Sequence, residues 1–266
     1  MPPMDEASRA FTRFGAADLQ VHTSHGDGMA DARALFERIE RTTDLDVMAV
    51  TDHDDVRGAL LAREIHAQGH YHFEFVPGIE VTTRSGHLLA LWIDQPVRSF
   101  RSLAETVATI HRLGGLAVVP HPLSYLTRSI GERALDRLLA DADPETRPDG
   151  IEVANTSLAG RVTGKRGLRL NRERWGLAET GGSDAHFPED VGSAWTLFPG
   201  QTAAVLRAAI EAHETLGVLG ASTPLREIGV RRLAAQQVRG LATTPRKVLG
   251  PPVLRFARRM RQAVGV

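Results

Sequence analysis

The segment ADLQVHTSHGDG, residues 17–28, alternates polar and apolar side chains and then reaches an Asp-Gly pair. Alternate side chains of a β-strand lie on the same face, so Gln20 and His22 would point the same way. Two imidazoles at such positions would suit a metal ion, yet the first position holds an amide. The segment therefore predicts a strand that carries part of a metal site with one unusual member.

Six further short apolar runs follow, separated by segments with helical periodicity. Residues 29–42 and 102–115 place apolar side chains three and four apart, and the second segment ends at Gly114 and Gly115, as a helix should. Strands alternating with helices predict a parallel sheet with both faces covered, and seven such units fit a barrel better than an open sheet. We expect an α/β fold of seven such units, arranged as a barrel rather than an open sheet, with strands at 19–22, 47–51, 75–79, 87–93, 116–119, 150–153 and 178–182.

The composition indicates a globular protein. With 266 residues and 42% hydrophobic content, the chain can bury a sizeable core. It has no cysteine, so disulfides and thiolate ligands are excluded, and any metal must be held by nitrogen and oxygen. The first residues lack the apolar run of a signal peptide, and no uncharged stretch of transmembrane length occurs. We expect a cytoplasmic protein without a transmembrane segment.

The charge is unevenly distributed. Residues 221–266 hold ten Arg or Lys and one acidic residue, although the whole chain is neutral. We expect a barrel domain at 1–220 and a basic helical tail at 221–266, broken near Pro245 and Pro251. The tail would dock on the acidic barrel or bind an anionic partner, and with Phe256 as its only aromatic residue it has little means of stacking on bases. A short membrane-surface helix is a further alternative for its end.

Histidine and carboxylate residues recur where the predicted strands end. In a parallel barrel those ends share one rim, so residues distant in sequence converge there. Imidazole and carboxylate ligands in such number suit two or three divalent ions. The residues concerned are His22, Asp27, His53, Glu80, His121, Asp184 and His186, together with His87 at the start of a strand.

These motifs resemble, in order, those of the polymerase and histidinol phosphatase (PHP) family of metal-dependent phosphoesterases. That family opens with a His-x-His strand and an Asp-Gly turn, here Gln20-Val21-His22 and Asp27-Gly28. The other motifs appear as Thr51-Asp52-His53-Asp54, Gly78-Ile79-Glu80, His87-Leu88-Leu89, His121-Pro122 and Gly182-Ser183-Asp184-Ala185-His186. The resemblance covers roughly residues 17–220 and implies a distorted (β/α)7 TIM-like barrel.

The resemblance also implies a ligand set. Gln20, His22, Glu80 and Asp184 would surround a first metal, and Glu80 would bridge to a second held by His87 and His121. Asp27, His53 and His186 would bind a third. A glutamine carbonyl is a poorer donor than imidazole, so the first site should be weaker and favour Mn²⁺, Fe²⁺ or Mg²⁺ over Zn²⁺. The expected cofactors are two or three divalent ions, Mn²⁺, Fe²⁺ or Zn²⁺.

Further residues are candidates for catalysis or substrate binding. Asp54, Asp184 and His186 are the catalytic candidates, although Asp54 and its neighbour Asp52 fit better as acceptors that orient an imidazole. The candidates for binding substrate are Arg128, Asn155, Lys165, Arg166 and His25. For Lys165 and Arg166 a solvated helix face is an equally good interpretation, and His25 fits better as a structural or exposed residue.

The implied activity is hydrolysis of a phosphoester by a metal-bound hydroxide. The substrate would be a small phosphorylated metabolite, a nucleotide or an oligonucleotide end, and nucleic acid is an open possibility. One alternative is a catalytically weakened binding module with an incomplete first metal site. Another is a barrel hydrolase for C–N or C–O bonds, against which the Asp27-Gly28 turn and the Thr51–Asp54 motif argue.

Overall fold

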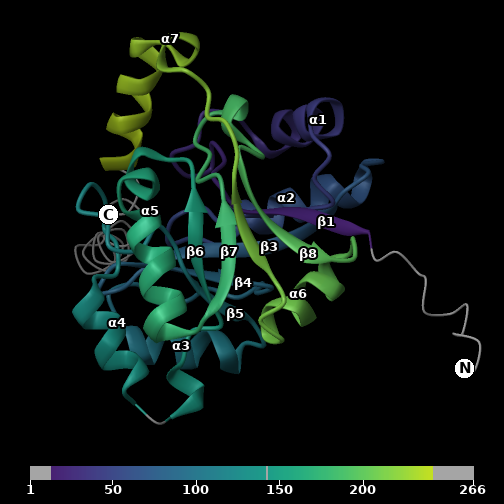
Figure 1. Cartoon of the computed structure of the whole chain (residues 1–266). Coiled ribbons are helices and arrows are strands. Elements are labelled where there is room, and N and C mark those ends of the chain that lie inside the picture. The colour runs from purple at the N-terminus through teal and green to yellow at the C-terminus, as the bar shows by residue number, and fades with distance from the viewer. Residues whose placement is uncertain (1–12, 142, 242–266) are drawn as a thin grey trace, which may run out of the picture.

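The computed structural model describes residues 13–141 and 143–241. In this part of the chain, strands form one nine-stranded sheet in the order β7-β6-β5-β4-β3-β2-β1-β8-β9, which curves nearly into a barrel (Figure 1). The strands are β1 (Phe14–Val21), β2 (Val47–Val50), β3 (Glu74–Thr82), β4 (His87–Leu91), β5 (Leu116–Val119), β6 (Gly150–Asn155), β7 (Ala178–Gly182), β8 (Ala194–Pro199) and β9 (Leu216–Leu219).

Helices cover the outside of this sheet (Figure 1). Capping side chains mark the starts of two of them. The Asp31 side chain accepts from the Ala34 N–H at the start of the first helix, and the Ser102 side chain accepts from the Glu105 N–H at the start of the third. The helices are α1 (Ala32–Thr42), α2 (Arg57–Gln68), α3 (Leu103–Arg112), α4 (Glu132–Leu139), α5 (Leu158–Leu170), α6 (Ala203–Glu211) and α7 (Leu225–Ile228). Short helical turns lie at Pro144–Thr146, Asn171–Trp175 and Pro188–Asp190.

The predicted α/β barrel is confirmed, and β1 to β7 match the seven predicted strands. The prediction of an all-parallel sheet is wrong, because β4 runs antiparallel to both β3 and β5. This reversal brings His87, at the start of β4, to the edge where the other strands end. Strands β8 and β9 were not predicted, and they add an antiparallel pair beside β1.

The barrel closes at its rim between β1 and the segment after β7. Val21 and Ala185 form a parallel bridge, and the His22 N–H donates to the Ala185 carbonyl at 3.0 Å. The Ser183 N–H donates to the buried Asp18 carboxylate at 2.9 Å. These contacts bring the first and last motifs of the sequence side by side.

The core explains why the strands read as nearly continuous apolar runs. Every residue of β2, β4, β5 and β6 is buried, as expected for strands packed on both faces. Outside β2 and β3, Phe36 of α1 packs edge-on against Phe73 with ring centroids 5.6 Å apart. Burying each such ring contributes about 1.5–3 kcal/mol. The rim side chains are therefore mounted on a rigid frame.

After β9 the chain continues through α7 into a helix at residues 230–241, which packs against the barrel. Docking on the barrel is one of the roles considered for the basic tail. The domain boundary at 220 stays a prediction, and the expected breaks near Pro245 and Pro251 lie outside the described residues. None of the helices in the described ranges has the length and apolar character needed to cross a bilayer.

Candidate metal centre

The rim of the barrel gathers the histidines and carboxylates of the sequence motifs. Several of them follow a strand end: His22 comes directly after β1, His53 shortly after β2, and His121 two residues after β5. Glu80 lies inside β3, next to its end. His121 and Asp184 adopt positive φ angles of 30° and 56°, which are unfavourable for residues with a Cβ and concentrate at functional sites.

Glu80 is the hub of this rim. Its Oε1 lies 2.7 Å from His87 Nδ1 and 3.1 Å from His121 Nε2. Its Oε2 lies 3.2 Å from His22 Nε2 and 3.5 Å from His53 Nδ1. The side chain is 1% exposed, and the surrounding imidazoles hold its pKa well below the usual value despite its burial. One carboxylate is thus shared by four histidines, the arrangement expected of a bridging ligand.

Asp27 collects a second group. Its Oδ2 lies 3.2 Å from His186 Nε2 and 3.9 Å from His53 Nε2, and its Oδ1 lies 3.8 Å from His22 Nδ1. The turn that places it requires Gly28, because a Cβ there would lie 2.1 Å from the His22 carbonyl oxygen. The Asp-Gly pair therefore folds the loop tightly back onto the end of β1.

Three groups of ligand atoms, each within 4.8 Å of one another, lie in the described part of the chain. The first and third metals implied by the resemblance correspond to two of them, with His22 added to the Asp27 group. The remaining group differs from the predicted second site, because it contains His53 together with Glu80 and His87 and does not include His121. His121 contacts Glu80 separately. The groups are His22, Asp27, His53 and His186; His53, Glu80 and His87; and His22, Glu80 and Asp184.

The chemistry of these groups fits divalent cations. Both ring nitrogens of His22 and the Oδ1 of Asp27 are buried without a hydrogen-bond partner in the described residues. Such atoms are costly to bury, and coordination of a cation would satisfy them. Although burial opposes charge, contacts with Asp184 and Glu80 raise the pKa of His22 well above its usual value.

Gln20 faces this rim, but the structure turns its carbonyl away from it. Its Nε2 donates to Glu80 Oε2 at 3.2 Å, and its Oε1 accepts from Asn155 Nδ2 at 3.3 Å. Asn155 cannot be flipped, because its Oδ1 accepts from the Ser157 backbone N–H at 2.9 Å and its Nδ2 donates to Glu152 Oε2.

The orientation of Gln20 is thus set from both ends. Asn155 presents only a donor to it, and the Glu80 carboxylate presents only an acceptor. A flipped amide would oppose donor to donor and acceptor to acceptor. The N–H₂ group of Gln20, which cannot bind a cation, thus faces Glu80, and this arrangement disfavours the predicted role of Gln20 as a ligand.

Two residues that the sequence analysis did not select support the ligands. Ser129 Oγ lies 2.8 Å from His121 Nδ1, and Glu152 Oε2 accepts the His121 backbone N–H at 2.9 Å. Burial raises the pKa of Glu152 to about 8. Hydrogen-bonding partners of this kind orient metal-binding imidazoles. A glutamate in an apolar strand was the available signal for Glu152, whereas nothing marked Ser129.

Asp52 and Asp54 support the rim loops. Asp54 accepts from the backbone N–H and the Oγ1 of Thr82, each at 2.8 Å, and from Ser99 Oγ at 2.6 Å. Asp52 accepts from the backbone N–H and the Oγ1 of Thr23 at 2.7 and 2.6 Å. These bonds favour roles in positioning the rim loops, through backbone N–H and hydroxyl groups. A catalytic role for Asp54 stays a prediction.

Among the candidates for binding substrate, Asn155 and Arg128 lie with the metal centre. Asn155 is buried in the network of Gln20. The Arg128 carbonyl accepts the His87 N–H at 2.7 Å, and its exposed guanidinium lies 5.6 Å from the centroid of the Phe100 ring. His25 instead points its Nε2 at Asp55 Oδ2, 3.2 Å away.

Lys165 and Arg166 lie two turns into α5, away from its start at the rim. Both are exposed, and Arg166 donates to Glu132 of α4 at 2.6 Å. This placement favours the solvated helix face, one of the two interpretations of these residues, and their role in binding substrate stays a prediction. The helix begins beside Asn155 and then runs down the outside of the barrel.

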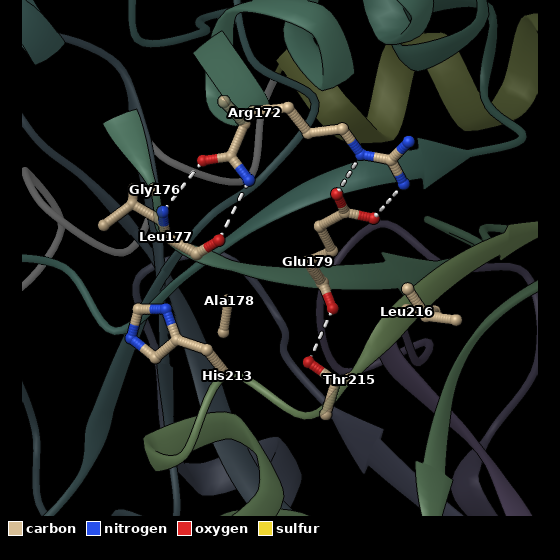
Figure 2. A pocket seen from close by; sticks show the side chains of 9 residues that line it. Arg172, Gly176, Leu177, Ala178, Glu179, His213, Thr215 and Leu216 are labelled. Carbon is tan, nitrogen blue, oxygen red and sulfur yellow. Dashed lines mark hydrogen bonds and ion pairs between the residues drawn. The ribbon is translucent and has the colours of Figure 1, made fainter. Parts of the chain in front are cut away.

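A pocket of about 250 Å³ lies at the opposite end of β7, around its first residues, Ala178 and Glu179 (Figure 2). Its charged groups are paired: Arg172 donates to both oxygens of Glu179, at 2.6 and 3.0 Å. Thr215 Oγ1 donates to the Glu179 carbonyl at 2.7 Å. Its charges are satisfied and its His213 is exposed, and none of the metal-ligand groups found among the described residues lies in this pocket.

Comparisons with known proteins agree with the geometry of the rim. Residues 169–215, which include β7 and the Asp184 and His186 motif, match a family model described as PHP-associated. Over these residues the chain is similar to PHP-associated proteins. It is 28% identical over 150 residues to the uncharacterized protein MJ1587 of Methanocaldococcus jannaschii, covering 52% of this chain and 81% of that one.

Solved structures share the fold. One is a two-domain protein from Bacteroides vulgatus, described as containing a predicted PHP-like metal-dependent phosphoesterase; its TM-score is 0.59 at 16% identity, covering 85% of this chain and 70% of that one. Another is an amidohydrolase from Chromobacterium violaceum with bound sulfate, with a TM-score of 0.53 at 20% identity, covering 77% of this chain and 98% of that one. At these identities the likeness shows a shared fold and nothing further.

Proposed function

We propose that this PHP-like protein is a metal-dependent hydrolase, and specifically a phosphoesterase. The observation that carries the proposal is the sharing of Glu80 and His22 between adjacent groups of buried ligand atoms. Sites in which one carboxylate serves neighbouring cations are suited to in-line displacement at phosphorus. The phosphoesterase named among the structural neighbours supports the same reaction class.

The reaction adds water to phosphorus and breaks the P–O ester bond, releasing an alcohol and a phosphate. Divalent cations held by these ligands would activate the water and neutralise charge on the phosphoryl oxygens. The side chains of Asp184 and His186 are 10% and 18% exposed, more than those of His22 and Glu80 beneath them. A substrate would therefore meet Asp184 and His186 first, in line with their selection as catalytic candidates.

We propose Arg128 as the cation that holds the substrate. Its loop is tied to two ligands, through the bond from His87 to its carbonyl and through the neighbouring Ser129 on His121. An exposed guanidinium so placed suits a phosphate, which it can bind with two parallel hydrogen bonds. Arg128→Ala should raise KM more than it lowers kcat.

The test is turnover by the purified protein with Mn²⁺, Fe²⁺ or Zn²⁺. The substrates are aryl phosphates, nucleoside bisphosphates and short RNA, the classes of small metabolite, nucleotide and oligonucleotide end. The control is His121→Ala, which removes one of the four imidazoles that contact Glu80 and lies outside the strands. Hydrolysis that depends on added metal and on His121 supports the proposal. No turnover above the His121→Ala control on any substrate overturns it.

One observation favours a second candidate. An amidohydrolase shares the fold, so hydrolysis of C–N bonds deserves an arm of the same assay. An N-acyl amino acid serves as the probe, with release of the amine as readout. Metal-dependent amine release without phosphate release would assign the rim to the second reaction class.

A further inference from the structure

The segment after β9 crosses the rim of the barrel. Thr223 fastens its start, because its N–H donates to Asp190 Oδ1 at 3.1 Å and its Oγ1 donates to the Glu189 carbonyl at 3.0 Å. Figure 1 shows α7 and the helix that follows it, in yellow, beside the edge of the barrel. Residues 221–241, called the cap below, thus begin on the loop that follows Asp184 and His186.

One face of the helix at residues 230–241 carries all the described contacts with the rim loops. Its members are Arg232 and the residues four, seven and eight positions after it, which lie on one face of a helix. These are Gln236, Arg239 and Gly240. Arg232 donates to both oxygens of Glu189, at 2.9 and 3.1 Å. The neighbouring Arg231 is exposed.

The same face reaches the loop that carries Asp27. Arg239 donates to the carbonyl oxygens of Ser24 at 2.8 Å and Gly26 at 3.4 Å. The cap therefore bridges the two loops that hold Asp27 and His186, whose side chains lie 3.2 Å apart.

Gln236 brings the cap onto the metal centre itself. It is 7% exposed, and its Nε2 lies 3.5 Å from Asp27 Oδ2. Gly240 allows this approach, because a Cβ at that position would lie 3.1 Å from the same oxygen. Asp27 is accordingly 2% exposed. The helix backbone lies against a residue expected to hold a cation.

We propose that the cap completes the metal centre, with Gln236 as a positioning residue for Asp27, and that it restricts the substrate to terminal phosphate groups. This inference rests on the proposed phosphoesterase function. The side chains of His53, Asp184 and His186 keep 10–18% exposure, whereas Asp27 beneath the cap is covered. A phosphate at a chain end can reach so narrow an opening. An internal phosphodiester, with a chain on both sides, needs an open groove.

Two variants release the cap in different ways. Arg232→Ala removes its bidentate bond, and Arg231→Ala is the matched control, since it removes the same charge from the exposed neighbouring position. Gly240→Val pushes the helix off Asp27 without changing any charge. Proteinase K cleavage within 221–241 reports release, and circular dichroism reports whether the barrel is folded.

The substrate readout is the ratio of two rates with Mn²⁺: phosphate release from a 5′-phosphorylated short oligonucleotide and internal cleavage of one with both ends blocked. We expect the wild type and Arg231→Ala to prefer the terminal phosphate. Arg232→Ala and Gly240→Val should shift the ratio about tenfold toward internal cleavage, an amount equivalent to 1.4 kcal/mol.

The positioning readout is the affinity for Mn²⁺ alone, measured by calorimetry. Gln236→Met keeps the size of the side chain and removes its donors, and it should weaken the weakest Mn²⁺ site about tenfold. Gln236→Glu places a carboxylate within reach of the same cation and should tighten that site. A merely structural role for Gln236 would leave the two variants alike.

The outcomes separate the two proposals. If the wild type binds no Mn²⁺ and releases no phosphate, the proposed function fails. If it does both, but Arg232→Ala and Gly240→Val keep the substrate ratio and Mn²⁺ affinity of Arg231→Ala, the cap proposal is overturned. Equal Mn²⁺ affinities of Gln236→Met and Gln236→Glu would overturn the role of Gln236.

Discussion

At the rim of the barrel the Glu80 carboxylate lies within 3.5 Å of four imidazoles, whereas at the other end of the sheet Glu179 meets the single guanidinium of Arg172. Glu80 is buried, and its neighbour His22 has nitrogens without hydrogen-bond partners in the described residues. Glu179 is half-buried with both oxygens bonded. A glutamate is thus fully paired at one end of the sheet, whereas at the other end the buried groups around a glutamate are suited to binding a cation.

The largest effect should come from removing the hub of the rim. Glu80→Gln replaces a shared anion by a neutral amide, so we expect metal affinity to fall by at least about 100-fold and turnover to fall with it. Glu179→Gln makes the same exchange at the opposite end and should leave both unchanged. Calorimetry with Mn²⁺ and the phosphate-release assay measure the two variants. Equal losses of Mn²⁺ affinity and turnover in the two variants would contradict a metal centre located at the rim.

Metal should also stabilise the fold from the rim. At Mn²⁺ concentrations near 100 Kd, binding to the native state adds about 2.7 kcal/mol per site, which corresponds to a rise in Tm of about 5–10 °C for a chain of this size. Chelation should reverse the rise, and Glu80→Gln should not show it. Thermal unfolding followed by circular dichroism tests this, and a Tm indifferent to Mn²⁺ would speak against preformed ligand groups.

At the other end, pH should modulate stability through a paired histidine. His111 points one nitrogen at the Glu145 carbonyl and the other at Asp149, both at 2.9 Å, so the doubly protonated ring satisfies both. The bond to Asp149 raises the pKa of His111 above its usual 6.5. Its stabilisation is therefore complete below pH 6.5 and lost as the pH rises through the raised value.

We expect His111→Gln to lower the free energy of unfolding of the metal-free protein by about 1 kcal/mol at pH 5.5 and to have little effect at pH 9. Urea unfolding at the two pH values measures it. A loss that grows with pH would contradict the assignment.

The smallest effect concerns Gln20. Since its amide donates to Glu80 and its carbonyl faces Asn155, Gln20→Met should change the affinity for Mn²⁺ by less than about threefold. His22→Met, on the same face of β1, should weaken it by 10-fold or more. A loss for Gln20→Met as large as that for His22→Met would restore Gln20 as a ligand.

The sequence predicted the barrel because apolar runs and helical periodicity are local signals. The reversed direction of β4 was not predicted, because no residue of a short apolar strand encodes the direction of that strand. The convergence of Glu80, Asp27 and their histidines followed from where the strands end. The orientation of Gln20 depends on the Ser157 N–H and Asn155, over a hundred residues away in sequence, and could not be read from β1.

The position of the cap over the metal centre was not predicted, for a similar reason. Arg232, Gln236 and Arg239 form a basic amphipathic helix, which indicates a docking or binding face without naming its target. That target is set by Glu189 and by the Ser24 and Gly26 carbonyls, and main-chain acceptors leave no mark on the sequence.

The central claim is that the rim holds more than one divalent cation through Glu80. Its most direct test is the number of metal ions bound per chain, determined by elemental analysis of protein equilibrated with Mn²⁺ and freed of excess, for the wild type and Glu80→Gln. We predict two or three ions per wild-type chain, and at least one fewer in Glu80→Gln. One ion or none per wild-type chain, or the same number in both proteins, would contradict the account.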